Sequence, residues 1–256
     1  MKLKQFFTQK TFLPSLHRHF TRQGTLLYFV PHQDDELLTM GIDICTAATE
    51  NADVHVILCT DGCKSQTRKV LQNGQTCPLH DEPHTYELNK EDFIKARDAE
   101  FINSCLLLGV PRENIHIPPE RAVDGTLNVT TAEIIVKKYL HQCGENSAVR
   151  TIYFNTDPQQ HNDHKVLGQA VYNLWQKGLI CEVMFFKEPY CSADSNVNFT
   201  CSRASKKIAQ RVLDAINNYG YWAPNEGRYA IGHHSVPQFF NDLRRKMKIY
   251  YLIMHK

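Results

Sequence analysis

The sequence has no long hydrophobic run and almost no net charge. None of its 256 residues falls in a stretch of the ~18 consecutive apolar residues that a membrane-spanning helix requires. The 29 basic and 27 acidic side chains leave a formal net charge of +2, and the aromatic residues are not interleaved with basic runs. We therefore predict neither a membrane span nor a nucleic-acid partner.

Paired cysteines are also absent. The nine cysteines are scattered and odd in number, and they lack the C-x2-C spacing of a structural zinc site. Cys45, Cys59, Cys105 and Cys181 lie in apolar runs, where a free cysteine behaves as a small hydrophobic residue. Because no secretory signal is recognisable, we expect reduced thiols and a cytoplasmic location. Cys191 and Cys201, in a polar loop, are the pair for which a disulfide stays open.

Acidic residues are missing from positions 1–24, which carry several lysines and arginines. The apolar residues of this segment are interrupted by polar ones and by Pro14, so it has no continuous signal-peptide core. We expect a basic helix packed on the domain. Contact with an anionic membrane surface is the alternative.

The residues that are present alternate between strand-like and helix-like patterns. With 42% hydrophobic residues and no repeat, low-complexity segment or linker, the chain is expected to form one domain. Strands are expected at Thr25–Val30, His55–Cys59, Asn114–Ile117, Thr151–Asn155 and Glu182–Phe186, and helices at Leu37–Thr49, Lys90–Leu108, Thr131–Gln142, His164–Lys177 and Ala204–Asn217. This alternation implies βαβ units, the α/β class and a parallel sheet.

Two stretches fall outside this alternation. Residues 62–89 show no sustained period and are expected to form a long functional loop. The segment Tyr219–Phe240, rich in aromatic residues, glycine and proline, is expected to cap the mouth of an active site. Its His233 and His234 are interpreted as surface or core histidines, with substrate contact as the alternative.

A cluster of ionisable residues, His32, Asp34, Asp35 and Glu36, directly follows the predicted strand Thr25–Val30. In open α/β sheets, the turn after the carboxyl end of a strand is where ligands bind. Partly buried charges are costly there unless they are paired. This stretch alone leaves two interpretations open. One is a helix-capping turn, in which Asp34 or Asp35 accepts backbone N–H bonds, and the other is a metal site.

A second cluster of the same kind changes the balance. His161, Asp163 and His164 follow the predicted strand Thr151–Asn155 and precede a helical pattern. Catalytic zinc takes three protein ligands, often two histidines and one carboxylate, and keeps one position open for water. The two turns together supply this set with carboxylates to spare, which favours a metal site.

These residues resemble a known family. The segments Pro31–Glu36 (PHQDDE) and His161–His164 (HNDH) are similar to two motifs of the PIG-L (LmbE-like) zinc-dependent N-acetylglucosaminyl deacetylases, (A/P)-H-(P/Q)-D-D-E and H-x-D-H. Cys59–Gly62 resembles the T-x-G turn of the family, and Arg97–Val110 its R-x-x-E helix ending in L-G-V. The resemblance spans residues 25–188.

The resemblance implies a Rossmann-like three-layer α/β fold with a mostly parallel sheet and an active site at the carboxyl ends of its strands. It implies a single deacetylase domain over residues 1–256, in which 1–24 is a basic extension and 204–256 matches only loosely. The implied activity is hydrolysis of the acetyl group of an N-acetylated amino sugar, a GlcNAc-type glycoside or glycolipid. The implied cofactor is Zn²⁺; Fe²⁺ is an alternative for similar nitrogen and oxygen ligands.

The family pattern also implies roles for individual residues. Carried over to this chain, it makes His32, Asp35 and His164 the zinc ligands and Asp34 the general base. His161, as an imidazolium, is expected to stabilise the tetrahedral oxyanion and to protonate the leaving amine.

Further residues are expected to support this machinery. Asp163 is expected to orient and charge His161. Arg68 is expected to contact the substrate, and a solvated loop arginine is the alternative. Arg97 and Glu100, spaced i, i+3, are expected to pair as structural support. Gln33 occupies a position at which many members of the family have proline, so the sequence does not determine how rigid this turn is.

Other functions stay open besides deacetylation of a sugar. One is deacylation of a non-sugar N-acyl secondary metabolite. A nucleotide-binding α/β transferase is disfavoured because the chain has neither G-x-G-x-x-G nor a P-loop. A protein that binds metal without catalysis is disfavoured because every expected chemical position is filled. Whether the protein forms a homo-oligomer is left open.

Overall fold

The computed structural model describes residues 24–189, 191 and 197–256. The predicted basic helix within 1–24 therefore lies outside the described residues, apart from residue 24. Among the described helices, none is long and apolar enough to cross a membrane.

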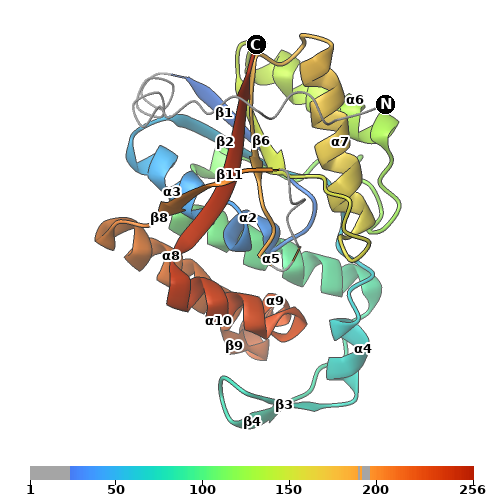
Figure 1. The fold of residues 1–256 in the computed structure, drawn as a ribbon. Helices are drawn as coiled ribbons and strands as arrows, with labels where there is room; N and C mark the ends of the chain where they lie inside the picture. The colour runs from blue at the N-terminus through green and yellow to red at the C-terminus, as the bar shows by residue number, and fades with distance from the viewer. Residues whose placement is uncertain (1–23, 190, 192–196) are drawn as a thin grey trace.

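A seven-stranded sheet forms the middle of the molecule (Figure 1). Its strand order is β5-β2-β1-β6-β7-β11-β8. The strands are β5 (Ile115–His116), β2 (Asp53–Leu58), β1 (Thr25–Val30), β6 (Ala148–Ile152), β7 (Glu182–Phe186), β11 (Lys248–His255) and β8 (Thr200–Arg203). Neighbours from β5 to β7 pair in parallel, whereas β11 is antiparallel to both β7 and β8. The predicted α/β class with a mostly parallel sheet is confirmed.

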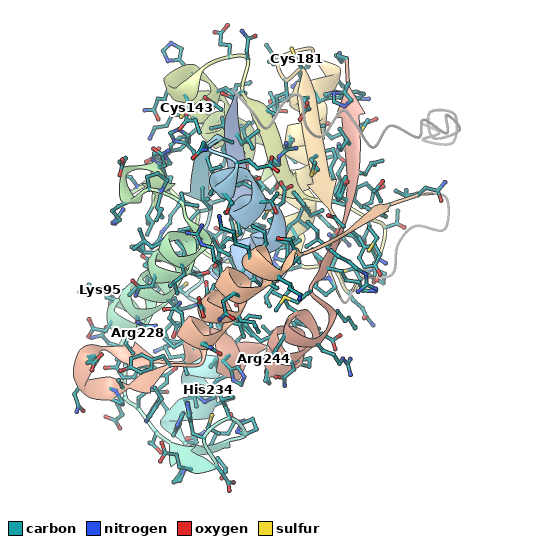
Figure 2. All side chains as sticks on the ribbon, turned by 90° about the vertical axis from the view of Figure 1, so that its left-hand side faces the viewer. Lys95, Cys143, Cys181, Arg228, His234 and Arg244 are labelled. Atoms are coloured by element: carbon teal, nitrogen blue, oxygen red, sulfur yellow. The ribbon has the colours of Figure 1, made fainter. Side chains whose placement is uncertain are left out.

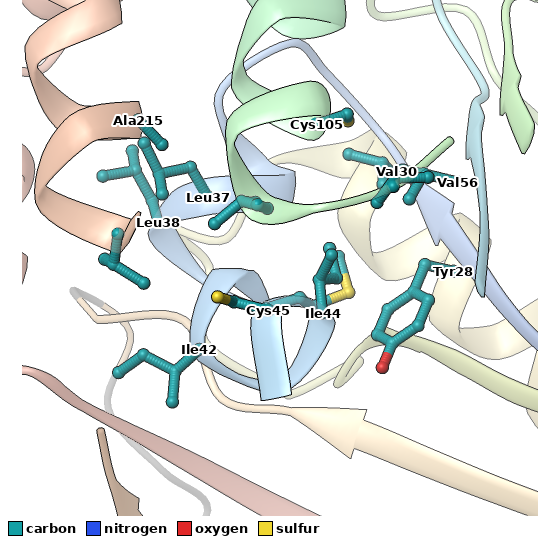
Figure 3. Close-up of a cluster of buried hydrophobic side chains, with 14 of the residues drawn as sticks. Tyr28, Val30, Leu37, Leu38, Ile42, Ile44, Cys45, Val56, Cys105 and Ala215 are labelled. Carbon is teal, nitrogen blue, oxygen red and sulfur yellow. The ribbon is translucent and has the colours of Figure 1, made fainter. Parts of the chain in front are cut away.

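Helices cover both faces of the sheet, which gives three layers (Figure 1). One face carries α2 (Asp35–Leu38), α3 (Gly41–Thr49), α5 (Lys90–Leu108), α8 (Lys206–Tyr219) and α10 (Pro237–Lys246), and the other carries α6 (Val129–Cys143) and α7 (Asn162–Gln176). Successive residues of a strand point to opposite faces. Tyr28 and Val30 accordingly belong to the first core, part of which Figure 3 shows, and Leu27 and Phe29 to the second. Strand β1 is therefore apolar on both sides, as its sequence indicates.

Local sequence signals correctly predict where the longest described helix begins and ends. Helix α5 has the predicted bounds, Lys90–Leu108. Asn89 caps its start by accepting a hydrogen bond from the Asp92 backbone N–H, and Gly109 ends it in the left-handed conformation with φ of 101°. Both signals can be read from neighbouring residues alone.

Several predicted elements are shifted by one or two residues, and two differ more from the observed ones. The predicted helix Leu37–Thr49 is split into α2 and α3. At Gly41, where α3 begins, a Cβ would lie 3.0 Å from Leu37 Cδ1, so the absent side chain lets the two helices approach closely. The predicted strand Thr151–Asn155 instead runs over Ala148–Ile152, in register with its neighbours β1 and β7.

The predicted loop 62–89 contains short regular elements, which corrects the expectation of an irregular loop. These are α4 (Thr67–Gln72) and the hairpin of β3 (Gln75–Cys77) and β4 (Glu82–His84), which projects from the body of the molecule (Figure 1). Elements of three to six residues are too short to show a sustained hydrophobic period. Leu71 of α4 instead packs in a separate small core with Phe93, and His84 of β4 stacks on Trp222 beside this core.

The carboxyl-terminal strand β11 was not predicted. Strand β8 likewise occupies the end of what was predicted to be a polar loop. Their pairing with β7 and with each other is antiparallel and joins segments distant in the chain, so only the tertiary structure reveals it. The elements that complete the described fold are η2 (Arg112–Asn114), β9 (Trp222–Ala223), η3 (Pro224–Glu226), β10 (Arg228–Tyr229) and α9 (Ile231–Ser235).

Candidate active site

The candidate site lies along the carboxyl ends of the parallel strands. The loops after five of these strands each bring a polar side chain to this edge: His32 after β1, Asp61 after β2, Asp124 after β5, His164 after β6 and Glu188 after β7. Because parallel strands end at one edge, residues far apart in the sequence meet there.

The turn after β1 has an uncommon backbone conformation. Asp34 has φ of 101°, in the left-handed region that residues other than glycine rarely adopt. Arg97, which is buried in α5, stabilises this turn by donating hydrogen bonds to Gln33 O at 2.8 Å and Gly62 O at 2.7 Å. One of its nitrogens also lies 3.4 Å from Asp34 Oδ2. The guanidinium thus holds both the backbone and the carboxylate of the turn.

Gln33 anchors the turn where many family members have proline. Its Nε2 donates to Asp98 Oδ1 at 2.7 Å and to Asp61 O at 3.2 Å. Gly62 makes room for this side chain, because a Cβ at Gly62 would lie 2.1 Å from Gln33 Oε1, and its φ is +64°. Side-chain hydrogen bonds therefore supply the rigidity that proline would provide through its ring.

The three predicted metal ligands present their donor atoms to one another. His32 Nδ1 lies 2.9 Å from His164 Nε2, and Asp35 Oδ2 lies 3.4 Å from the first and 3.1 Å from the second. Ligand atoms held ~2.0–2.1 Å from a tetrahedral zinc ion lie about 3.3–3.4 Å from one another. The triangle of two nitrogens and one oxygen therefore fits the ligands of a single ion.

Both histidines are held so that the converging nitrogens carry lone pairs. Asp163 Oδ2 and Asp124 Oδ1 lie 3.2 and 3.3 Å from His32 Nε2, which makes this nitrogen the protonated one. Glu188 Oε1 lies 2.5 Å from His164 Nδ1 and plays the same part there. His32 Nδ1 and His164 Nε2 are then left as acceptors, the state in which imidazole binds a metal.

The electrostatics of the site favour a bound cation. Burial alone raises the pKa of Asp35, but His164 and His32 outweigh it and hold this pKa well below its usual range. Burial lowers the pKa of His164, whereas Asp35 and Glu188 raise it to about 9. Burial likewise lowers the pKa of His32, but the carboxylates of Asp124, Asp163 and Asp35 outweigh burial and raise this pKa. The carboxylates therefore favour positive charge at the two histidines, and a divalent cation bound between the converging atoms would balance the same carboxylates.

Asp34 differs from its neighbour Asp35 in both position and pKa. It lines the cavity without joining the triangle of converging donor atoms. Burial raises its pKa to about 7, against the opposing charge of Arg97. Glu36, fully buried behind it, accepts hydrogen bonds from the Asp34 backbone N–H at 2.9 Å and from Tyr219 Oη at 2.8 Å. Burial raises the pKa of Glu36 to about 8.

His161 stands at the rim of the site. Its side chain is 44% exposed, and its ring lies edge-on to that of His32 with centroids 4.6 Å apart. Burial, and then positive charge on His32 and His164, lower its pKa. The predicted partner of His161 was Asp163, whose Oδ2 lies 3.9 Å from His161 Nδ1 and closer, at 3.2 Å, to His32.

Asp163 also holds the loop that crosses the site. Its carboxylate accepts hydrogen bonds from the backbone N–H groups of Gly125 at 2.7 Å and Leu127 at 3.2 Å. Its own backbone N–H donates to His161 Nδ1 at 3.2 Å, which caps the start of α7. One side chain therefore couples the second histidine motif to the loop that carries Asp124.

Sequence reasoning missed two residues of the site, Asp124 and Glu188. Asp124 joins His32, His161 and Asp163 in a group of donor atoms that all lie within 4.8 Å of one another. Glu188 fixes His164 and is itself held by Gln160 Nε2 at 2.9 Å. Both residues follow strands of the sheet, and that position at the carboxyl edge was the signal available in the sequence.

The predicted pair of Arg97 and Glu100 does not form. Among the described residues, neither a hydrogen bond nor an ion pair joins them. Glu100 instead accepts hydrogen bonds from the backbone N–H groups of Ile231 at 2.7 Å and Gly232 at 3.0 Å, at the start of α9. The two side chains therefore bind different segments: Arg97 binds the turn after β1, and Glu100 binds the start of α9.

A cavity of about 410 Å³ opens over the converging donor atoms. Two distant segments add further lining residues, one at the start of α4 and just before it (Lys64, Ser65, Gln66, Thr67) and one around the start of α10 (Ser235, Val236, Phe239). The predicted cap Tyr219–Phe240 thus contributes to the wall, although His233 and His234 do not line it. Arg68, half-buried on α4, is also not among the lining residues, so its contact with substrate stays a prediction.

Cys191 and Cys201 are free thiols, so the disulfide left open is not formed.

A parallel α/β sheet with a His-Asp-His donor set at its carboxyl edge, beneath an open cavity, is the arrangement of a metal-dependent enzyme. The PIG-L family model, described as GlcNAc-PI de-N-acetylase, matches residues 27–175, more than half of the chain. The chain belongs to the PIG-L family.

Solved structures with this fold include two deacetylases and one enzyme of another kind. The A40926 pseudoaglycone deacetylase Dbv21 has a TM-score of 0.63 at 14% identity, with 91% of this chain and 98% of that chain covered. The N,N′-diacetylchitobiose deacetylase from Pyrococcus horikoshii has a TM-score of 0.57 at 14% identity, with 91% and 84% covered.

The third structure is GalB, the 4-carboxy-2-hydroxymuconate hydratase from Pseudomonas putida. It has a TM-score of 0.57 at 14% identity, with 91% of this chain and 97% of that chain covered. The fold therefore also carries other chemistry, and function has to be argued from the site. No curated protein sequence matches the chain.

Proposed function

We propose that this protein is a zinc-dependent N-deacetylase that removes the acetyl group of an N-acetylated amino sugar. The observation that carries the proposal is the triangle of His32 Nδ1, Asp35 Oδ2 and His164 Nε2, with sides of 2.9–3.4 Å, at the floor of an open cavity. The donor set fits zinc, and Fe²⁺ is the alternative that metal analysis of the purified protein tests.

An acetamide resists hydrolysis because water is a weak nucleophile and the amine a poor leaving group. When bound, the metal lowers the pKa of a water towards ~7 and polarises the carbonyl. Asp34 lies beside the ligands but is held by Arg97 at 3.4 Å, so its carboxylate is positioned to remove the proton of the attacking water. Glu36 and the Arg97 hydrogen bonds to the turn keep that carboxylate aimed at the cavity.

His161 is proposed to act on the other half of the reaction. From the cavity rim it reaches the carbonyl oxygen and the amide nitrogen of a bound acetamide. As an imidazolium it stabilises the oxyanion and then donates its proton to the leaving amine. Asp124 and Asp163, which hold His32, also lie 3.9 Å from the nitrogens of His161, and they oppose the burial and the charges of His32 and His164 that lower its pKa.

Two properties support an amino sugar as the substrate. A cavity of about 410 Å³ has the size of the small-molecule sites that bind ligands of sugar size. The family description names GlcNAc-PI, and one of the similar structures is a deacetylase of N,N′-diacetylchitobiose. We further propose a GlcNAc-type glycoside or glycolipid, with Arg68 as a substrate contact on α4.

The test is release of primary amine from a panel of N-acetylglucosamine conjugates by the zinc-loaded protein, beside the Asp34→Asn variant. Release by the wild type, strongly reduced in the variant, is expected. Protein that holds zinc and releases no amine from any conjugate would overturn the amino-sugar proposal. Release from non-sugar N-acyl compounds alone would replace it with the deacylase alternative.

A further inference from the structure

The β3–β4 hairpin carries a second cluster of metal-binding side chains, which has no residue in common with the candidate active site. Cys77, His80 and His84 each place one ligand atom within 4.8 Å of the other two. The hairpin projects from the end of the molecule at which α9 lies (Figure 1). The spacing is C-x2-H-x3-H, and neither a catalytic nor a substrate-binding role has been assigned to these residues.

The distance between the sulfur and the first imidazole matches a shared ion. Cys77 Sγ lies 3.5 Å from His80 Nδ1. With zinc–sulfur ~2.3 Å and zinc–nitrogen ~2.0–2.1 Å, two such donors of a tetrahedral site lie about 3.5–3.6 Å apart. The turn between them is tight, because the Asp81 backbone N–H donates to Cys77 O at 2.8 Å and Asp81 adopts φ of 54°. The turn therefore holds the two side chains close together.

One ring nitrogen of His84 has a hydrogen-bond partner and the other has none. Its side chain is fully buried, and Nδ1 lies 3.1 Å from His234 Nε2. The other nitrogen, Nε2, has no hydrogen-bond partner, and Glu82 Oε1 lies 3.6 Å away. A buried polar atom without a partner costs free energy. A histidine with one nitrogen fixed by a neighbour and the other free has the arrangement of a metal ligand.

Packing explains only part of this arrangement. The His84 ring stacks on Trp222 with centroids 3.7 Å apart, which accounts for its burial and orientation. Stacking leaves Nε2 unsatisfied, however, and it does not account for Cys77 and His80 converging on the same place. A cation bound there satisfies all three side chains at once.

We propose that Cys77, His80 and His84 bind a zinc-type divalent cation, with Glu82 or a water as the fourth ligand. A thiolate with two imidazoles is a donor set that selects zinc over magnesium or calcium. Through the contact of His84 with His234, the ion ties the hairpin to α9; Figure 2 labels His234 beside the hairpin. The same excursion of the chain contributes Lys64–Thr67 to the cavity wall, so the ion stabilises one side of the cavity without taking part in the reaction.

The first test counts bound zinc in the full-length protein after equilibration with Zn²⁺ and removal of the excess. Two ions per chain are expected in the wild type, and one in His80→Ala, whose exposed side chain can be removed without disturbing a core. His164→Ala is also expected to hold one ion, because it retains the hairpin site. Cys181→Ser is the control: this exposed free cysteine lies away from the hairpin, and its variant keeps two.

The second test uses Co²⁺ in place of zinc, because a thiolate bound to cobalt gives a near-ultraviolet charge-transfer band. The band is expected in the wild type, in His164→Ala and in Cys181→Ser, and it is expected to be lost in Cys77→Ser. One zinc per wild-type chain, two in His80→Ala, or a cobalt–thiolate band that survives Cys77→Ser would each overturn the hairpin site. None of these readouts depends on deacetylase activity.

Discussion

Two regions of the molecule bury charged side chains, and they do so in different ways. One is the candidate active site at the carboxyl edge of the sheet. The other, here called the Arg150 cluster, consists of Tyr28, Asp43, Arg150 and Glu182. In this cluster Arg150 lies 3.4 Å from both Asp43 and Glu182, and Tyr28 Oη donates to Asp43 Oδ2 at 2.7 Å.

The Arg150 cluster is neutralised by a cation of the protein itself. The guanidinium is 1% exposed and stands between two carboxylates, whose charge raises its pKa against the effect of burial. The candidate site instead holds several carboxylates around two imidazoles whose lone pairs converge, and it opens into a cavity. Buried charge by itself therefore does not mark a functional site. Converging lone pairs with access from solvent do.

The largest effect on turnover is expected from His164→Ala, which removes one of three converging donors. The variant should lose the ion of the active site, and amine release should fall by about 10³-fold or more, because the metal supplies several kcal/mol of transition-state stabilisation. Metal content and amine release measure the two effects. His141→Ala, the same change on an exposed position of α6, should alter neither.

Asp34→Asn should separate catalysis from metal binding. Asparagine tolerates the left-handed conformation of this position, so the turn should persist. The ion should be retained while turnover falls by ~10²–10⁴-fold, the usual effect of losing a general base. Turnover equal to that of the wild type, in protein with full metal content, would rule out the base role of Asp34.

A smaller effect is expected from Glu188→Gln, which weakens the hydrogen bond to His164 Nδ1. Loss of such a supporting carboxylate typically lowers metal affinity ~10–100-fold. Competition with a chelator measures this affinity. The fully loaded variant should lose less turnover than Asp34→Asn does, and an unchanged zinc affinity would show that Glu188 does not orient the ligand.

The smallest effect on turnover is expected from Arg150→Met. This variant leaves Asp43 and Glu182 buried without their cation, which should lower the free energy of unfolding by ~3–5 kcal/mol. Turnover per folded molecule should stay within about twofold of the wild type, since the cluster lacks contact with the cavity. Urea unfolding and amine release below the transition measure the two quantities. A large loss of turnover with unchanged stability would contradict the distinction between the two regions.

Much of the fold followed from local sequence patterns. Strand β1 and helix α5 had their observed bounds, because an apolar run and a capped amphipathic segment are specified by neighbouring residues. The short elements α4, β3 and β4 escaped prediction because three to six residues show no period, and because contacts such as Leu71 with Phe93 and His84 with Trp222 join segments apart in the chain. Strand β11 escaped because its partners β7 and β8 are distant in the chain.

The candidate site was also predicted only in part. The sequence by itself determined the two clusters His32–Asp35 and His161–His164, since dense polar residues after strand-like runs stand out in any linear reading. The convergence of their donor atoms within 2.9–3.4 Å agrees with the expectation that both clusters face one ion.

Only the tertiary structure showed that Asp124 and Glu188 belong to the site. It also showed that Arg97 binds the turn after β1 and does not pair with Glu100. It further brought a ligand atom of His84 to within 4.8 Å of those of Cys77 and His80. The reason is physical. Hydrophobic period and capping act between near neighbours, whereas the partner of a carboxylate or an imidazole depends on strand order, which brings His32 and His164, 132 residues apart, together at one edge of the sheet.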